Sequence, residues 1–262
     1  MMPSRGIADE LLDLLFPPRC QVCDTLGSDP ICATCLASIE FIGEHACAYC
    51  GQPLPPSASS AALCADCLEG RHISGARAAG LHAAGLREAI VRFKYDGRTR
   101  LAEPLAAMLA RVIVAEAERG GLPLSECAAL VPVPLHPARR AWRGFDQAEL
   151  LCRLMREAVG MPVWGDVLAR VRNTIPQVRL RGASRLANVR GAFAARRPWK
   201  LRGRAVILVD DVFTTGATMG ECARVLRESG AVAVYALTVS RAAPRWHPAG
   251  FLDDIDAARD GR

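Results

Sequence analysis

Residues 205–218 read Ala205-Val-Ile-Leu-Val-Asp-Asp-Val-Phe-Thr-Thr-Gly-Ala-Thr218. The apolar run at 205–209 is typical of a strand that is buried on both faces of a parallel sheet. Two acids follow it, Asp210 and Asp211, and then a loop of hydroxyl and glycine residues. Residues 219–229 have the apolar spacing of a helix. The order strand, acid pair, loop and helix therefore predicts an α/β fold, with a mostly parallel sheet and flanking helices.

The loop after the acid pair has the composition of a phosphate site. Ligands of open parallel sheets bind outside the carboxyl ends of the strands, and backbone N–H groups, hydroxyls and a helix N-terminus together bind phosphate. Carboxylates repel phosphate, so the acids suit sugar hydroxyls or a Mg²⁺ ion. The pattern predicts a ribose 5-phosphate site, and the alternative is a plain buried strand with an incidental acidic turn. The residues predicted to bind are Asp210, Asp211, Thr214, Thr215, Gly216, Ala217 and Thr218.

The same stretch resembles the signature with which type I phosphoribosyltransferases bind phosphoribosyl diphosphate (PRPP). That signature is an apolar strand, two acids, two apolar residues and a loop rich in Thr and Gly, and every position is matched. Neither a nucleotide P-loop motif nor a dinucleotide-binding glycine turn occurs in the chain. The resemblance implies the type I phosphoribosyltransferase fold, with PRPP and Mg²⁺ as ligands.

Composition indicates a globular protein of one or two domains. The chain has 262 residues, of which 51% are hydrophobic and 23% are charged, and its net charge is +6. That charge suits a phosphate-rich ligand or a nucleic-acid surface. The apolar runs are short and interrupted by charge, which argues against membrane insertion. Residues 1–17 contain acids among leucines, so we expect an amphipathic helix at 7–16 rather than a secretory signal, and a cytoplasmic protein.

Eight of the 11 cysteines lie before residue 68, in four Cys-x-x-Cys pairs. Two such pairs form a tetrahedral Zn²⁺ site, so four predict two sites. Disulfides would require an oxidising compartment, and a redox motif would explain one pair but not four. Residues 18–72 are therefore predicted to form a double zinc-ribbon module with two structural Cys₄ sites. Its predicted zinc ligands are Cys20, Cys23, Cys32, Cys35, Cys47, Cys50, Cys64 and Cys67.

The pairing of these knuckles has two solutions. Sequential pairing joins the first knuckle to the second and the third to the fourth, whereas a cross-brace joins the first to the third. Eight residues separate Cys23 from Cys32, and 13 separate Cys50 from Cys64. Such short loops favour sequential pairing without excluding the cross-brace. The remaining cysteines have no ligand spacing and are predicted to be buried core thiols: Cys127, Cys152 and Cys222.

Residues 75–242 are predicted to form the phosphoribosyltransferase-like domain, and residues 243–262 a flexible tail. Besides the elements above, we expect strands at 75–84, 128–134 and 232–239, and helices at 86–95, 101–118 and 144–155. The string at 92–98 is basic and aromatic. Its favoured interpretation is packing by Phe93 and Tyr95 with solvated cations, and the alternative is a rim of the active site or a nucleic-acid contact.

A cluster of basic residues follows the strand predicted at 128–134. Its members are predicted to lie on one loop: His136, Arg139, Arg140 and Arg143. Clustered guanidinium groups suit a diphosphate, and the alternative is a surface arginine cluster. In the transferase fold the loop after the first core strand holds the pyrophosphate group, so the resemblance implies that role here. Arg143 is predicted to act with Asp210 and Asp211 in catalysis.

Two further motifs narrow the resemblance to the ComF family, which has a zinc-ribbon module followed by a phosphoribosyltransferase domain. They are Pro-Leu-His-Pro with Arg-Gly-Phe-x-Gln at 134–147, and the pattern of a mobile flap within 168–193, whose predicted residues include Arg170, Thr174 and Gln177. Asp146 stands where the family usually has Asn, so we expect no direct phosphate contact there.

The family resemblance implies a protein linked to competence and DNA uptake. We expect it to bind PRPP and Mg²⁺ and to transfer the phosphoribosyl group to an acceptor that the sequence does not identify. The alternative is a non-catalytic DNA-processing accessory protein, whose zinc ribbons bind single-stranded DNA or a DNA-uptake helicase. A third hypothesis, a structural adaptor with a vestigial site, is opposed by the intact sequence at 205–218.

Overall fold

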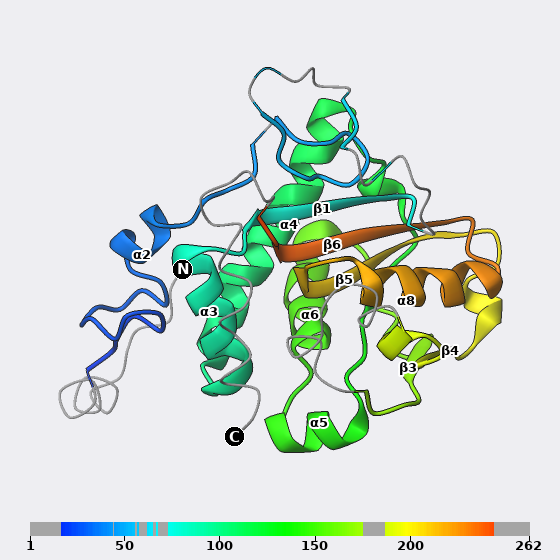
Figure 1. The fold of residues 1–262 in the computed structure, drawn as a ribbon. Coiled ribbons are helices and arrows are strands. Elements are labelled where there is room, and N and C mark those ends of the chain that lie inside the picture. The colour runs from blue at the N-terminus through cyan, green and yellow to red at the C-terminus, as the bar shows by residue number, and fades with distance from the viewer. Residues whose placement is uncertain are drawn as a thin grey trace.

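The computed structural model describes residues 17–43, 45–55, 57, 62–64, 67, 73–174 and 187–243 (Figure 1). The helix predicted at 7–16 and, apart from its first residue, the tail predicted at 243–262 lie outside these residues. Gln177 of the predicted flap lies outside them as well.

Four parallel strands form the central sheet. Their order across the sheet is β1 (Gly75–Leu81), β6 (Ala233–Arg241), β5 (Ala205–Phe213) and β2 (Leu130–Pro132). Parallel neighbours cannot be joined by tight turns, so the connecting segments cross over the faces of the sheet. A separate antiparallel pair is formed by β3 (Leu168–Arg170) and β4 (Phe193–Ala195). The predicted α/β class with a mostly parallel sheet and flanking helices is confirmed.

Helices cover both faces of this sheet (Figure 1). The described helices are α2 (Ala33–Ala37), α3 (Ala84–Tyr95), α4 (Ala102–Arg119), α5 (Pro137–Arg143), α6 (Gln147–Val159) and α8 (Ala217–Glu228). Short 3₁₀ turns occur at η2 (Thr99–Leu101), η3 (Leu124–Glu126) and η5 (Pro198–Lys200). Gly120 ends α4 with a φ of 62°, a left-handed conformation that glycine adopts without strain.

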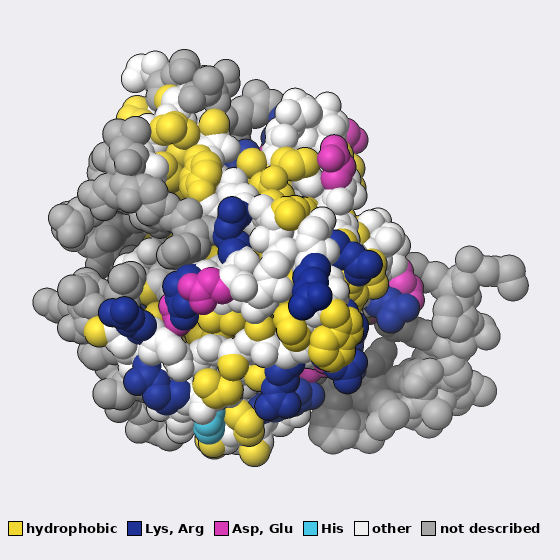
Figure 2. Space-filling model, turned by 90° about the vertical axis from the view of Figure 1, so that its right-hand side faces the viewer, with side chains coloured by type: hydrophobic (Ala, Val, Ile, Leu, Met, Phe, Trp, Pro, Cys, Tyr) yellow, Lys and Arg dark blue, Asp and Glu magenta, His cyan; other side chains and the backbone are white. Residues whose placement is uncertain are grey.

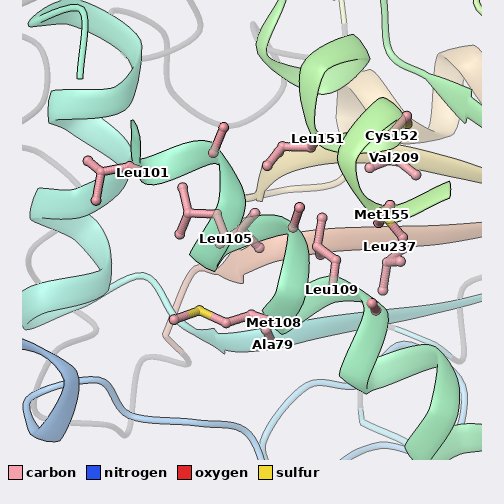
Figure 3. Close-up of a cluster of buried hydrophobic side chains, with 14 of the residues drawn as sticks. Ala79, Leu101, Leu105, Met108, Leu109, Leu151, Cys152, Met155, Val209 and Leu237 are labelled. Carbon is pink, nitrogen blue, oxygen red and sulfur yellow. The ribbon is translucent and has the colours of Figure 1, made fainter. Parts of the chain in front are cut away.

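Alternate residues of β5 enter two different cores. Ile207 and Val209 pack with α3, α4 and α6, whereas Val206 and Leu208 pack with α8 and the β3–β4 pair. Figure 3 shows the first core, where side chains of α4 and α6 meet Val209 of β5. A strand between two cores has apolar residues at every position, which explains the unbroken run at 205–209.

The first zinc ribbon and the segment after it pack on the edge of the sheet. Cys20 and Ile39 belong to the core around α3 and α4. Residues 40–42 pair with β1: Leu81 N donates to Glu40 O at 2.8 Å, and Ile42 N donates to Ala79 O at 3.1 Å. This segment covers the edge of β1, which would otherwise expose unpaired backbone groups.

The second ribbon is held on β1 and the end of β6 by backbone groups and by two arginines, the half-buried Arg77 and the buried Arg241. Ala76 N donates to Tyr49 O at 2.8 Å, and Arg77 Nη2 donates to Ala48 O at 3.0 Å. Arg241, at the end of β6, donates to Cys50 O at 2.6 Å. Both ribbons therefore contact the sheet domain directly.

Besides the strands β3 and β4, which were not predicted, two elements differ from the prediction. The basic cluster expected on a loop lies on helix α5, because Pro137 suits a first helical turn, His136 Nδ1 accepts from Ala138 N at 3.3 Å, and Gly144 ends the helix with a φ of 82°. In addition, β5 continues past residue 209 to Phe213, since its acid pair still lies beside β6 in the parallel ladder.

Candidate functional site

Two acids lie at the carboxyl end of β5. Asp211 is buried, with 4% of its surface exposed, and its Oδ1 lies 2.7 Å from Lys94 Nζ of α3. Asp210 is half-buried, and its Oδ1 accepts from Asp211 N at 2.9 Å. Burial and the neighbouring carboxylate of Asp211 raise the pKa of Asp210 to about 8, although Lys94 opposes the shift. The two carboxyl groups of Asp210 and Asp211 have one lysine between them. When both are ionised they carry more negative charge than Lys94 neutralises, so the pair can bind a proton, a cation or hydroxyl donors.

Lys94 is a site residue that the sequence interpretation missed. It was expected to be solvated, but it is 18% exposed and paired with Asp211. Burial opposes its charge, yet the Asp211 carboxylate outweighs this, so the pKa of Lys94 is raised. The expected packing of Phe93 is confirmed, because that ring is fully buried. No local signal marks Lys94, since its pairing depends on the contact between α3 and β5.

The predicted phosphate loop lies between β5 and α8. Gly216 has a φ of 75° and forms the N-cap of α8, a conformation that favours glycine. Thr214 is half-buried, Thr215 is exposed and Ala217 is buried. Glycine has no side-chain acceptor, so its own side chain does not cap the first turn of α8. Thr218 is half-buried in the first turn of α8.

The predicted basic residues separate into two groups. Arg139 Nη2 donates to Thr174 O at 3.0 Å, and Arg170 donates to the Thr174 hydroxyl. Burial and repulsion from Arg139 lower the pKa of Arg170, while Asp210 opposes this shift. The structure thus brings Arg139 together with Arg170 and Thr174, two residues of the predicted flap, beside Asp210.

Arg143 contacts the two neighbouring helices α6 and α3. Its Nη1 donates to Gln147 Oε1 at 2.6 Å, and its guanidinium carbon lies 5.2 Å from the ring centroid of Tyr95, the neighbour of Lys94 in α3. By contrast, the 57%-exposed Arg140 pairs with Glu149 of α6 at 3.2 Å. His136 caps α5.

Several buried polar atoms of the predicted site residues and of β6 have no partner among the described residues. They are Arg143 Nε, Arg170 Nε, Asp211 Oδ2 and Thr238 Oγ1. Thr238 lies opposite Asp210 in the ladder between β5 and β6. Buried polar groups in folded proteins are nearly always hydrogen-bonded, so such a gathering is typical of a place that receives a ligand.

Asp146 has a structural role in this region. Its Oδ2 accepts from Leu135 N at 2.9 Å, and its Oδ1 accepts from Glu149 N at 3.2 Å. Burial raises the pKa of this carboxyl. Both oxygens hold the turn that leads into α6.

The cysteine knuckles assemble in sequential order. Within each set of four, the sulfur atoms all lie within 4.8 Å of one another; the sets are Cys20, Cys23, Cys32 and Cys35, and Cys47, Cys50, Cys64 and Cys67. In the second set, Cys50 Sγ lies 3.5 Å from Cys64 Sγ, and Cys47 Sγ lies 3.8 Å from Cys67 Sγ. A tetrahedral zinc with Zn–S bonds of about 2.3 Å spaces its sulfurs by about 3.8 Å, so both sets fit zinc.

The prediction for the remaining three cysteines is confirmed. Cys127, Cys152 and Cys222 are buried, as predicted for core thiols. Among the helices that the structure describes, none is both long enough and apolar enough to cross a membrane.

The sequence is similar to a known domain family and to several known proteins. Residues 11–68 match the double zinc ribbon domain family. DNA utilization protein YhgH of Escherichia coli (strain K12) is 30% identical over 229 residues, which is 84% of this chain and 96% of that protein. Competence protein F of Haemophilus influenzae is 29% identical over 220 residues, covering 83% and 87% of the two chains. The match to YhgH of Salmonella typhi, 34% identical over 143 residues, spans 55% of this chain and 61% of that protein.

Among solved structures, glutamine phosphoribosylpyrophosphate amidotransferase of B. subtilis, complexed with ADP and GMP, aligns at 23% identity and a TM-score of 0.34. That alignment covers 52% of this chain and 25% of the amidotransferase.

Proposed function

Because this chain belongs to the ComF family, with DNA utilization protein YhgH and competence protein F as relatives, we propose that it binds PRPP and Mg²⁺ at the carboxyl end of β5. The proposal includes transfer of the phosphoribosyl group to an acceptor. It also includes a role in DNA uptake, which rests on the names of the relatives. A cytoplasmic location fits, because Cys₄ zinc sites require reduced cysteines.

One observation carries the proposal: two acids and a glycine-containing loop lie together at the end of a parallel strand. Asp210 and Asp211 would accept hydrogen bonds from the ribose hydroxyls and hold Mg²⁺, for which the unpartnered Asp211 Oδ2 is suited. Residues 214–218 would bind the 5′-phosphate with N–H groups and hydroxyls. This binding is remote from the reacting bond, so it would position the anomeric carbon.

In the transfer, the bond between the anomeric carbon and the pyrophosphate breaks. The sugar gains positive charge, and the leaving pyrophosphate gains negative charge. Arg139 and Arg143 would stabilise that leaving group, and bound Mg²⁺ would add positive charge there. His136 and Arg140 are the weaker candidates, because one caps α5 and the other pairs with Glu149.

The flap is assigned a role in excluding water. Arg170 and Thr174 already contact each other next to Arg139, and the proposal adds Gln177 to them. Closure of such a segment over PRPP would protect the sugar cation from hydrolysis.

A second candidate function is a DNA-processing accessory protein whose zinc ribbons bind single-stranded DNA or a DNA-uptake helicase. The first ribbon and the segment after it expose large apolar side chains, since Leu26 is 61% and Phe41 is 54% exposed. Basic side chains are also spread over a different face of the molecule, the one that carries α8 and the β3–β4 pair, with few acidic ones between them (Figure 2). A surface of this kind favours a polyanion.

The experiment that separates the two candidates follows pyrophosphate release from PRPP with Mg²⁺, over a panel of free bases and amines. Acceptor-dependent release by the zinc-loaded protein, abolished in Arg143→Lys, is the expected result. Arg140→Lys is the matched control on α5 and should retain most of the activity. Binding of oligothymidylate with a steep salt dependence, without any pyrophosphate release, would favour the accessory function instead.

A further inference from the structure

Arg241, at the carboxyl end of β6, is a buried cation. Only 4% of its surface is exposed. Its Nη1 donates to Cys50 O at 2.6 Å, and its Nε donates to Gln52 Oε1 at 2.5 Å. Its guanidinium carbon lies 4.7 Å from the ring centroid of Phe213, which is the last residue of β5. One side chain therefore joins the second ribbon to the end of the strand that leads into the predicted phosphate loop.

Both ribbon partners of Arg241 belong to a zinc knuckle. Cys50 is a predicted zinc ligand, and its Sγ lies 3.5 Å from Cys64 Sγ in the second cysteine set. A backbone hydrogen bond closes the knuckle, since Cys47 N donates to Gln52 O at 2.7 Å. Zinc bound to this set would hold Cys47 and Cys50 on one metal. The positions of both acceptors of Arg241 therefore depend on the second zinc site.

The Phe213 ring lies at the start of the predicted phosphate loop. It is 2% exposed and packs in the same core as Met219 of α8. Residues 214–216 follow it directly and connect it to α8. The Phe213 carbonyl accepts at 2.9 Å from the backbone N–H of Ala242, the residue after Arg241. Two contacts, one through the ring and one through the backbone, thus fix the place where the loop begins.

Docking of the ribbon alone does not require this arrangement. Arg77 of β1 also donates to the ribbon, at Ala48 O, and its Nε lies 2.9 Å from the Glu116 carboxylate of α4. Arg241 differs, because its guanidinium lies over the ring that precedes the phosphate loop. A buried charge is stable only where its hydrogen bonds are made. A shift of the knuckle would therefore move the guanidinium and disturb the Phe213 ring beside it.

We propose that Arg241 is a positioning residue through which the second zinc ribbon sets the geometry of the predicted phosphate loop. When the knuckle is fixed, it holds the guanidinium, and the guanidinium holds the Phe213 ring. When the second zinc site is lost, the acceptors lose their fixed positions, and so does the start of the loop. This inference rests on the proposed function for the ligand of that loop, and it predicts that PRPP affinity depends on the second ribbon.

The test measures amide hydrogen exchange of residues 210–220 by mass spectrometry, in the full-length protein without PRPP. Arg241→Lys keeps the charge but loses the planar fork of donors, so exchange there should rise about tenfold, as expected for the loss of a hydrogen bond to a charged group. Cys47→Ser, which removes a ligand of the second zinc site, should have the same effect. The two changes together should raise exchange no further than either alone, because both act through Arg241.

The matched control is Arg77→Lys, which weakens the docking of the same ribbon on β1 and should leave this exchange unchanged. Unchanged exchange in Arg241→Lys would overturn the inference. An equal rise in Arg77→Lys would overturn it as well, because it would indicate a general loosening of the ribbon. Additive effects of Arg241→Lys and Cys47→Ser would exclude Arg241 as the connection.

A calorimetric titration of the same proteins with PRPP and Mg²⁺ separates this inference from the proposed function. Arg241→Lys should bind PRPP about tenfold more weakly than the wild type, whereas Arg77→Lys should bind it equally well. Equal affinity of Arg241→Lys and the wild type would overturn the inference. A wild type that binds no PRPP would contradict the proposed function, while the exchange measurement, made without PRPP, would still decide the role of Arg241.

Discussion

At the scale of single residues, the main feature is the buried ion pair between Asp211, at the end of β5, and Lys94. Asp211 and Lys94 form an ion pair in which the two side chains are 6% and 18% exposed. A pair of this kind contributes little net stability, but removing one partner leaves an uncompensated charge in the interior. The acid beside it, Asp210, adds a second carboxyl that the lysine does not contact.

Lys94→Met is expected to destabilise the protein by about 3–5 kcal/mol, because it leaves the Asp211 carboxylate buried without a counterion. Lys94→Met combined with Asp211→Asn removes both charges and should recover most of that loss. Urea unfolding measures the stability of both variants. Arg98→Met is the control. Arg98 pairs with Asp24, and their side chains are 34% and 40% exposed, so loss of this pair should lower stability by at most about 1 kcal/mol. An equally small loss in Lys94→Met would contradict the burial of the pair.

The raised pKa of Asp210 predicts a pH dependence of stability. Its folded pKa of about 8 lies above its ordinary value. The stability that it contributes is therefore fully present below about pH 4 and is lost as the pH rises towards 8. Asp210→Asn stays neutral, so its stability relative to the ligand-free wild type should rise between pH 5 and 8, by at most about 1.4 kcal/mol per unit. Urea unfolding at four pH values measures this difference, and a difference that does not change with pH would show that the Asp210 carboxyl is not perturbed.

At the scale of elements, the contacts between the ribbons and the sheet domain depend on close backbone approach. A Cβ on Gly85, in the first turn of α3, would lie 2.3 Å from Ser38 Oγ and 2.8 Å from Cys35 O. A Cβ on Gly51 would lie 2.9 Å from Ala76 O of β1. Real Cβ atoms do not approach this closely, so these glycines permit the docking of both ribbons.

Gly85→Ala should displace the first ribbon from α3 and lower stability by about 1–3 kcal/mol, as overpacked sites do. Gly220→Ala is the matched control, because Gly220 lies inside α8 with open space around it, and there alanine should be neutral or stabilise the helix by about 1 kcal/mol. Thermal unfolding compares the two variants. Equal stability of Gly85→Ala and wild type would mean that the ribbon does not rest on α3 as described.

Elements with a strong local pattern were predictable, and those that depend on distant partners were not. The run at 205–209 and helix α4 follow from hydrophobic periodicity, so their existence was foreseen. The strands β3 and β4 have three residues each, too few for a pattern, and were missed. Pro137 and Gly144 bound α5, but the arginines between them suggested a loop. The order of residues in 205–218 was enough to predict a strand, a loop and a helix, which are β5, residues 214–216 and α8, whereas the pairing of Lys94 depends on the contact between α3 and β5.

At the scale of the whole molecule, the two ribbons relate differently to the cores. Cys20 of the first set belongs to the large core that contains α3 and α4, whereas Cys47 of the second set lies in a small separate cluster with its fellow ligands. Zinc at the first site should therefore support the sheet domain as well as its own ribbon.

Removal of zinc by a chelator should release two ions per chain and lower the main unfolding temperature. Cys20→Ser and Cys47→Ser should each lose one zinc ion, but Cys20→Ser should lower the unfolding temperature of the sheet domain more. Metal analysis by atomic emission and differential scanning calorimetry measure the two effects. The reverse order of destabilisation would contradict the shared core around Cys20.

The most direct test of a phosphoribosyl site is a calorimetric titration of the zinc-loaded protein with PRPP and Mg²⁺. We predict saturable binding that requires Mg²⁺ and that disappears when Asp210→Asn is combined with Asp211→Asn. Asp29→Asn, a change at an exposed acid of the first ribbon, should leave the affinity unaltered. Absence of binding at millimolar PRPP, or equal binding by the Asp210 and Asp211 double variant, would contradict the assignment of the acid pair to this ligand.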